Sequence, residues 1–136
     1  MANYKNLCMK YMDEHGIKYL DHAENIIKVT YTGTNLRSIT VVVFFSDNGS
    51  PDVSFKCWDI CTFPEDKRIN GIIVCNQLNT HYRWVQFSLD KDGDIAVSSD
   101  SYVDEYNCGA ICCAFVQRTV NIVDEAYQTI MKALWS

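Results

Sequence analysis

The stretch Gln77–Val103, QLNTHYRWVQFSLDKDGDIAVSSDSYV, decides the fold of this 136-residue chain. It begins with the end of a helix, continues as a strand of alternating residues, turns at Asp92-Gly93 and returns as a second strand. Asp-Gly between two such strands is a strong hairpin signal, and hairpin register determines which side chains point to the core. The stretch contains no catalytic constellation, so it predicts architecture rather than activity.

Residues upstream of the hairpin predict three more strands. The segments 25–32, 37–46 and 52–61 alternate or are rich in β-branched and aromatic residues, and turn-forming residues separate them. Helical spacing predicts helices at 3–15, 64–80 and 108–135, and Thr62 with Glu65 has the spacing of a capping box before the second helix. The expected fold class is α+β, with element order α-βββ-α-ββ-α and an antiparallel five-stranded sheet packed with helices.

Length and composition fit one domain that spans residues 1–136. Hydrophobic residues make up 48% of the chain, which is enough to build a core. The net charge of −5 argues against nucleic acid as a partner, because phosphate backbones repel an acidic chain. The longest uncharged apolar run, Ile39–Phe45, is too short to cross a bilayer, and the first residues lack the apolar centre of a signal peptide. We therefore expect no membrane association and a cytoplasmic location.

The cysteines and the acidic turn could suggest metal binding, but their spacing argues against it. The cysteine count of seven is odd, and the residues occupy apolar positions of the pattern, as reduced core cysteines do. On a strand, Cys57 and Cys61 would lie about 13 Å apart, too far to hold one zinc ion. The segment Asp90–Asp94 lacks the glycine position and the final glutamate of an EF-hand loop, so it fits a hairpin turn. We predict no metal and no cofactor.

Three segments carry a resemblance to a known family. Asn76-Gln77-Leu78-Asn79 ends the middle helix, the strand Arg83–Asp90 follows it, and Asp92-Gly93-Asp94-Ile95 leads into the next strand. With the long amphipathic C-terminal helix, they resemble the YbjN-like family of the type III secretion chaperone-like fold over nearly the whole chain. The resemblance implies a small cytoplasmic protein that binds other proteins as a dimer. Secretion chaperones of this fold hold extended segments of effector proteins, and YbjN-like members are associated with regulation.

The strand pattern also predicts a second apolar surface on the sheet. Alternation places Val42 and Phe44 on the face turned away from the helices, and it places Trp84 there too. The inward face of the strand 52–61 is ambiguous, so Trp58 and Ile60 can join this surface. Exposed apolar patches mark interfaces, and tryptophan is favoured at their centres. We predict that these five residues, Val42, Phe44, Trp58, Ile60 and Trp84, bind a partner, unless a helix covers this face as well.

The predicted function is a non-enzymatic, chaperone-like or regulatory domain that binds a segment of a partner protein and forms a homodimer. A sensor that holds a small apolar molecule between sheet and helices is an alternative. An enzyme is a third hypothesis. None of His15, His22 and His81 has a sequence neighbour that would orient it as a base, so no catalytic residue is predicted. Convergence of His22, Asp59 and Cys57 in space would favour catalysis.

Overall fold

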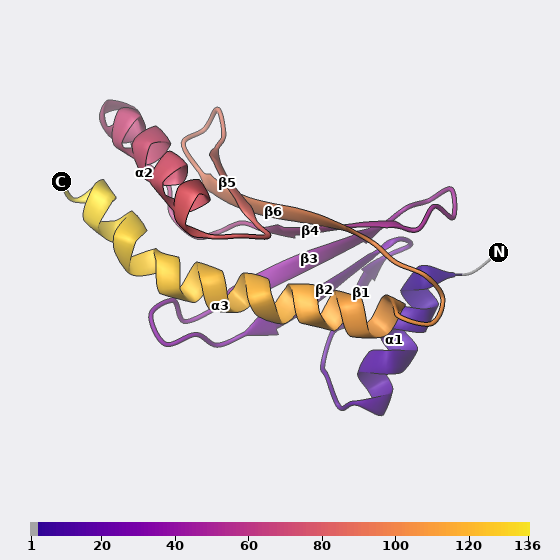
Figure 1. The fold of residues 1–136 in the computed structure, drawn as a ribbon. Coiled ribbons are helices and arrows are strands. Elements are labelled where there is room, and N and C mark those ends of the chain that lie inside the picture. Colours follow the sequence, from indigo (N-terminus) through magenta and orange to yellow (C-terminus); the bar gives the residue numbers. More distant parts are fainter. Residues whose placement is uncertain (1–2) are drawn as a thin grey trace.

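The computed structural model describes residues 3–136, which form three α-helices, one short 3-10 helix and six strands (Figure 1). The elements follow in the order α1 (Tyr4–Glu14), β1 (Leu20–Ala23), β2 (Ile26–Tyr31), β3 (Ile39–Phe45), β4 (Asp52–Cys57), η1 (Glu65–Lys67), α2 (Arg68–His81), β5 (Gln86–Leu89), β6 (Ile95–Tyr102) and α3 (Cys108–Leu134). The predicted α+β class with an antiparallel sheet is confirmed.

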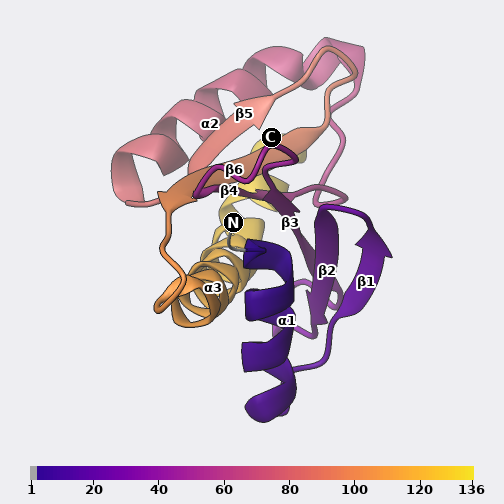
Figure 2. The same ribbon diagram turned by 90° about the vertical axis from the view of Figure 1, so that its right-hand side faces the viewer.

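The strands form one antiparallel sheet in the order β1-β2-β3-β4-β6-β5. The expectation of five strands is wrong, because β1 pairs with β2 as a sixth strand. Leu20 aligns with Lys28 and Asp21 with Ile27, and the register then shifts before Ala23. All residues of β1 are exposed, so no apolar alternation marks this strand in the sequence. Figure 2 shows β1 at the outer edge of the sheet.

One face of the sheet packs on the helices and forms the core. Alternate residues of the strands are buried there, among them Ile27, Val29, Val41, Val43, Val53, Phe55, Cys57, Phe87, Ile95 and Val97. Helix α3 runs across this face, and α1 packs against α3 (Figures 1 and 2). Phe55 of β4 stacks on Phe115 of α3 with ring centroids 5.0 Å apart. The two helices come close at Gly109, where an added Cβ would lie 2.2 Å from the Cβ of Tyr11.

Helix α2 protects the edge of the sheet formed by β5. The side chain of Asn79 donates to the carbonyl of Phe87 at 2.9 Å and accepts from its N–H at 2.6 Å. These are the main-chain groups that β5 leaves unpaired on the side away from β6, so a side-chain amide takes the place of a seventh strand. Asn79 belongs to the segment that carries the family resemblance in the sequence. On the opposite edge, β1, the carbonyl of Ala23 accepts from the ammonium of Lys5 at 2.6 Å, and no side-chain amide pairs with both main-chain groups of a residue in this strand.

The Asp-Gly hairpin is confirmed, whereas the predicted capping box is not. Gly93 adopts φ +86° between β5 and β6, and the carboxylate of Asp90 accepts the N–H groups of Asp92 and Asp94. These bonds make the acidic segment a closed turn. Thr62 does not cap a helix; its hydroxyl donates to Asp94, and the short helix η1 starts after Pro64 without a side-chain cap.

Candidate functional site

The face of the sheet opposite to α1 and α3 carries a groove of about 570 Å³. Strands β1, β2 and β3 and the loops at Ser38 and at Trp58-Asp59 line it, and no helix residue does. We call it the open-face groove, and its lining residues are Leu20, His22, Ile26, Lys28, Thr30, Ser38, Thr40, Val42, Phe44, Trp58 and Asp59. The alternative that a helix covers this face is therefore wrong for this part of the sheet.

Three of the five predicted partner-binding residues meet at the apolar centre of the groove. Val42 and Phe44 lie on β3, and Trp58 follows β4. The ring edge of Phe44 meets Trp58 with centroids 6.2 Å apart and planes at 88°. Val42 is 7% exposed, whereas Trp58 is 39% exposed. The groove thus has a packed apolar floor and a tryptophan that stands partly in solvent.

Polar side chains surround this apolar centre. The strand register aligns Val42 with Lys28 on one side and Lys56 on the other. The ammonium of Lys56 lies 5.7 Å from the centre of the Phe44 ring, in a cation–π contact. Thr30 and Thr40 share a hydrogen bond of 2.8 Å between their hydroxyls. An apolar centre with a polar rim is the usual composition of a protein-binding surface.

The structure places Ile60 in the core rather than on this surface. Ile60 is 6% exposed and belongs to the cluster of buried residues. The prediction failed because strand β4 ends at Cys57 and Asp59 then adopts φ +60°, which interrupts the extended strand before the chain continues beside β6 at Thr62. Alternation is lost at such a residue, so Ile60 turns inward.

Trp84 was also assigned to the wrong side of the sheet. Its indole meets Phe115 of α3 edge-on, with centroids 6.1 Å apart, and the guanidinium of Arg118 lies 5.5 Å from the ring centre. Trp84 precedes β5 and has φ +80°, so the strand pattern does not extend to it. It stays 60% exposed, but on the helix side of the molecule.

The residues that would have favoured catalysis do not converge. His22 and Asp59 both line the open-face groove, whereas Cys57 is buried on the core face of the sheet. Burial above all, and next the charge of Asp59, raises the pKa of the Cys57 thiol to about 12. A thiol with that pKa is protonated at neutral pH and is a poor nucleophile. This trio therefore does not form a nucleophile and base.

Comparison with solved structures identifies the fold. The chain superimposes on YbjN from E. coli, proposed to be a transcription regulator, with a TM-score of 0.66 and 11% identity over 94% of this chain and 93% of that one. The chain has a YbjN-like fold. Neither a protein-family model nor a curated protein sequence matches it.

Two proteins of type III secretion systems are also similar in structure to the chain. A chain of the heterodimeric ExoU–SpcU complex from Pseudomonas aeruginosa gives a TM-score of 0.54 at 12% identity, over 92% of this chain and 95% of that one. The chaperone SycH from Yersinia pestis, solved with a fragment of YscM2, gives 0.48 at 13% identity, over 88% of this chain and 99% of that one. At these identities the comparisons establish the architecture alone.

A surface that the sequence prediction missed lies on α2 of this YbjN-like fold. Ile69, Ile72 and Ile73 are 73%, 60% and 51% exposed, while Gly71, Val74, Cys75 and Leu78 of the same helix are buried. The three isoleucines form a stripe at i, i+3 and i+4, which we call the isoleucine stripe. Their helical spacing was visible in the sequence, but it did not show that the helix buries its other side.

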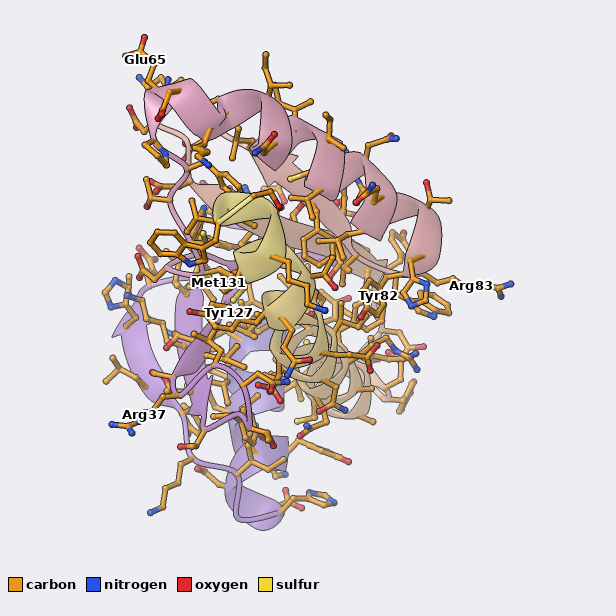
Figure 3. The ribbon with its side chains drawn as sticks, turned by 90° about the vertical axis from the view of Figure 1, so that its left-hand side faces the viewer. Arg37, Glu65, Tyr82, Arg83, Tyr127 and Met131 are labelled. Atoms are coloured by element: carbon orange, nitrogen blue, oxygen red, sulfur yellow. The ribbon has the colours of Figure 1, made fainter. Side chains whose placement is uncertain are left out.

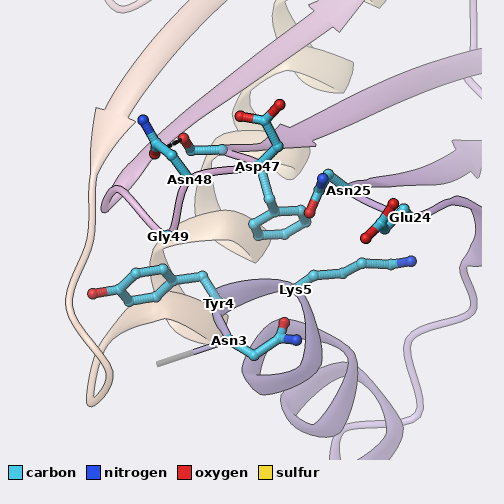
Figure 4. Close-up of a pocket in the computed structure, with 10 residues that line it drawn as sticks. Asn3, Tyr4, Lys5, Glu24, Asn25, Asp47, Asn48 and Gly49 are labelled. Atoms are coloured by element: carbon cyan, nitrogen blue, oxygen red, sulfur yellow. Dashed lines mark hydrogen bonds between the residues drawn. The ribbon is translucent and has the colours of Figure 1, made fainter. Parts of the chain in front are cut away.

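A polar hollow of about 380 Å³ lies where α1 begins (Figure 4). Its lysine, Lys5, is already bound, to the Asp21 carboxylate at 2.5 Å and the Ala23 carbonyl at 2.6 Å. Within residues 3–136, no three histidine, cysteine or acidic residues are grouped in a way that could hold a metal ion. None of the helices in this part of the chain is long and apolar enough to cross a membrane.

Proposed function

We propose that this protein is a non-enzymatic interaction domain, chaperone-like or regulatory, whose open-face groove binds a segment of a partner protein. The observation that carries the proposal is the cluster of Val42, Phe44 and Trp58 at the centre of a groove that no helix covers. A partly exposed tryptophan on an apolar floor provides a large contact area that water exclusion can stabilise.

The position of the groove favours an extended segment over a small molecule. The groove lies on the surface of the sheet, whereas a sensor for apolar ligands would use a cavity between sheet and helices. Leu20 and His22 of β1 form one wall, and β1 is the edge that Asn79 does not close. A partner strand could pair with β1 while its side chains enter the groove. The similar fold of a chain in the heterodimeric ExoU–SpcU complex adds support.

We also propose that the chain forms a homodimer through the isoleucine stripe. Helix α2 carries no carboxylate, so two copies can approach there although each chain has a net charge of −5. Packing of the stripe against its copy would bury three large apolar side chains that are exposed in a single chain. A cytoplasmic location is part of the proposal, supported by seven cysteines that are all free thiols.

The decisive experiment is quantitative affinity capture from native cytoplasm with the wild type and Trp58→Ala. We expect Trp58→Ala to lose the captured partner by tenfold or more, because a buried interface tryptophan contributes about 2 kcal/mol or more. The wild type with the purified partner should also show slowed hydrogen exchange in β1, β2 and β3.

Trp135→Ala is the matched control. Trp135 is 77% exposed at the end of α3 and outside the open-face groove, so its removal should leave capture unchanged. Equal capture by wild type and Trp58→Ala would overturn the proposal. If the partner is captured but hydrogen exchange in β2 and β3 is not slowed, the binding site lies elsewhere. That result would also contradict the proposal.

A further inference from the structure

Trp84 and Arg118 lie at the centre of a second cleft, between the end of α2 and the first half of α3. We call it the Trp84 cleft; its volume is about 530 Å³. It lies on the helix side of the sheet, so it is separate from the open-face groove. Figure 3 shows Arg83 extending from the end of α2 into solvent, beside Tyr82.

The fold presents Trp84 to solvent at a cost. A φ of +80° is unfavourable for a bulky side chain, and nothing in the local sequence requires a left-handed residue here. The indole packs edge-on against Phe115 and makes a cation–π contact with the guanidinium of Arg118, but it remains 60% exposed. Residues with strained backbone conformations are concentrated at functional sites, and exposed aromatic side chains are common at interfaces.

The cleft is basic although the chain is acidic. It contains two of the four arginines, Arg83 and Arg118, and no carboxylate lines it. Within residues 3–136, neither arginine takes part in a salt bridge. A cation–π contact with Trp84 does not use the N–H groups of the Arg118 guanidinium, which can still donate hydrogen bonds. Gln117 donates to Asn121 at 3.0 Å, which orients a further pair of amides along the wall of the cleft.

The nearby carboxylates of α3 are already engaged. This helix carries two, Asp124 and Glu125. Asp124 accepts the N–H groups of Thr34, Asn35 and Leu36, and Glu125 accepts from the hydroxyl of Tyr82 at 2.7 Å. Burial, followed by this bond to Glu125, raises the pKa of Tyr82 to about 12, so the hydroxyl remains a donor at neutral pH. Neither carboxylate forms a salt bridge with Arg83 or Arg118 in the part of the chain that the structure describes, so the two guanidinium groups are available to another molecule.

We propose that the Trp84 cleft binds a carboxylate-bearing segment of a partner protein. Guanidinium groups bind carboxylates through paired hydrogen bonds, and the exposed indole would cover an apolar residue next to the acidic one. The shallow shape favours a peptide, because a small ligand needs a site that encloses most of its surface. This inference does not depend on the open-face groove, and either surface can fail its test alone.

The test is fluorescence anisotropy with two labelled peptides, Glu-Glu-Leu-Leu-Glu-Glu and Lys-Lys-Leu-Leu-Lys-Lys. The wild type should bind the glutamate peptide at least tenfold more tightly than the lysine peptide, in spite of its net negative charge. Arg118→Gln should lose about tenfold in affinity, and added salt should weaken binding. The double variant Arg83→Glu/Arg118→Glu, which changes two exposed residues, should bind the lysine peptide more tightly than the glutamate peptide.

Arg37→Gln is the control, because it removes the same charge from an exposed position in the loop before β3, far from Arg83 in Figure 3. It should bind like the wild type, and circular dichroism should show that each variant is folded. Equal losses in Arg37→Gln and Arg118→Gln would overturn the proposal, as would a wild type that does not prefer the glutamate peptide. Complete competition by inorganic phosphate or by single-stranded DNA at equal charge concentration would assign the cleft to phosphates and also refute it.

Discussion

Lys5 of α1 forms an ion pair with Asp21 of β1, with 2.5 Å between Nζ and the carboxylate oxygen. The same ammonium donates to the carbonyl of Ala23 at 2.6 Å. Lys5 is 8% exposed, so these bonds are shielded from water on the lysine side, whereas the Asp21 side chain is mostly in solvent. Lys5 thus connects the edge strand β1 to helix α1.

Replacing Lys5 by Met should loosen β1 selectively. The loss of two charge-assisted hydrogen bonds should cost about 2 kcal/mol, since the remaining carboxylate stays hydrated. Hydrogen exchange measured by mass spectrometry should speed up in residues 20–23 more than in β3. Lys10→Met, at an exposed position of α1, should leave the exchange of β1 unchanged. If hydrogen exchange in β1 is the same in Lys5→Met as in the wild type, the pairing of β1 with β2 is sufficient to hold this strand.

Asp124 should stabilise the fold in a pH-dependent way. Its carboxylate accepts the N–H groups of Thr34, Asn35 and Leu36 at 2.8 to 3.0 Å, and so ties the loop after β2 to α3. The N–H of Leu36 above all holds the pKa of Asp124 below its ordinary value, and desolvation opposes this only in part. We expect Asp124→Asn to lose about 1 kcal/mol of unfolding free energy at pH 7, because solvent screens a carboxylate at the surface.

The sign of the pH effect follows from the lowered pKa. The stabilisation is present above the unfolded-state pKa of about 3.9 and is lost as the pH falls through the folded-state value. The unfolding free energies of the wild type and Asp124→Asn in urea should therefore begin to converge below about pH 4 and should meet only below the folded-state pKa of Asp124. Asp47→Asn, an exposed position without a side-chain hydrogen bond in the structure, serves as the control. A difference between wild type and Asp124→Asn that persists at acid pH would contradict the assignment.

The isoleucine stripe predicts the assembly state. Ile72→Glu should shift the chain from dimer to monomer in sedimentation velocity at micromolar concentration, because a carboxylate cannot be buried unpaired at an apolar contact. Ile72 is 60% exposed in a single chain, so the variant should still fold. Asn6→Glu, at an exposed position of α1, adds the same charge elsewhere and should leave the chain dimeric. A monomeric wild type would rule out the proposed dimer.

Buried thiols should resist alkylation. Burial raises the pKa of Cys57 to about 12 and that of Cys75 to about 11. At pH 8, roughly one Cys57 thiol in ten thousand is a thiolate, even before its inaccessibility is considered. Iodoacetamide should therefore leave Cys57 unmodified in native buffer and should label all seven cysteines in urea, as read by peptide mass spectrometry. Rapid labelling of native Cys57 would show that β4 opens readily.

The fold was predictable where hydrophobic periodicity is strong. Strands β2 to β6 and all three helices were anticipated because each buries a regular set of side chains. Strand β1 was missed for the opposite reason: its residues Leu20–Ala23 are all exposed, and backbone pairing with β2 and the contact of Asp21 with Lys5 define it. Long-range contacts of this kind leave no periodic signal in the sequence.

The site was predictable only while the chain kept its alternation. Val42 and Phe44 lie inside β3 and point as expected. Ile60 and Trp84 lie just outside β4 and β5, where Asp59 and Trp84 adopt positive φ. Glycine would have indicated such a conformation, but aspartate and tryptophan do not. The error therefore reflects backbone geometry that tertiary packing imposes.

The alignment of Lys28, Val42 and Lys56 across three strands has a consequence for colloidal behaviour. A bare sheet surface is a hazard, since layers from different molecules can stack and grow into insoluble aggregates. Stacking two of these surfaces without water would bury four ammonium groups of like charge, at several kcal/mol for each ion. The two lysines thus oppose nonspecific stacking of this sheet face on that of a second molecule.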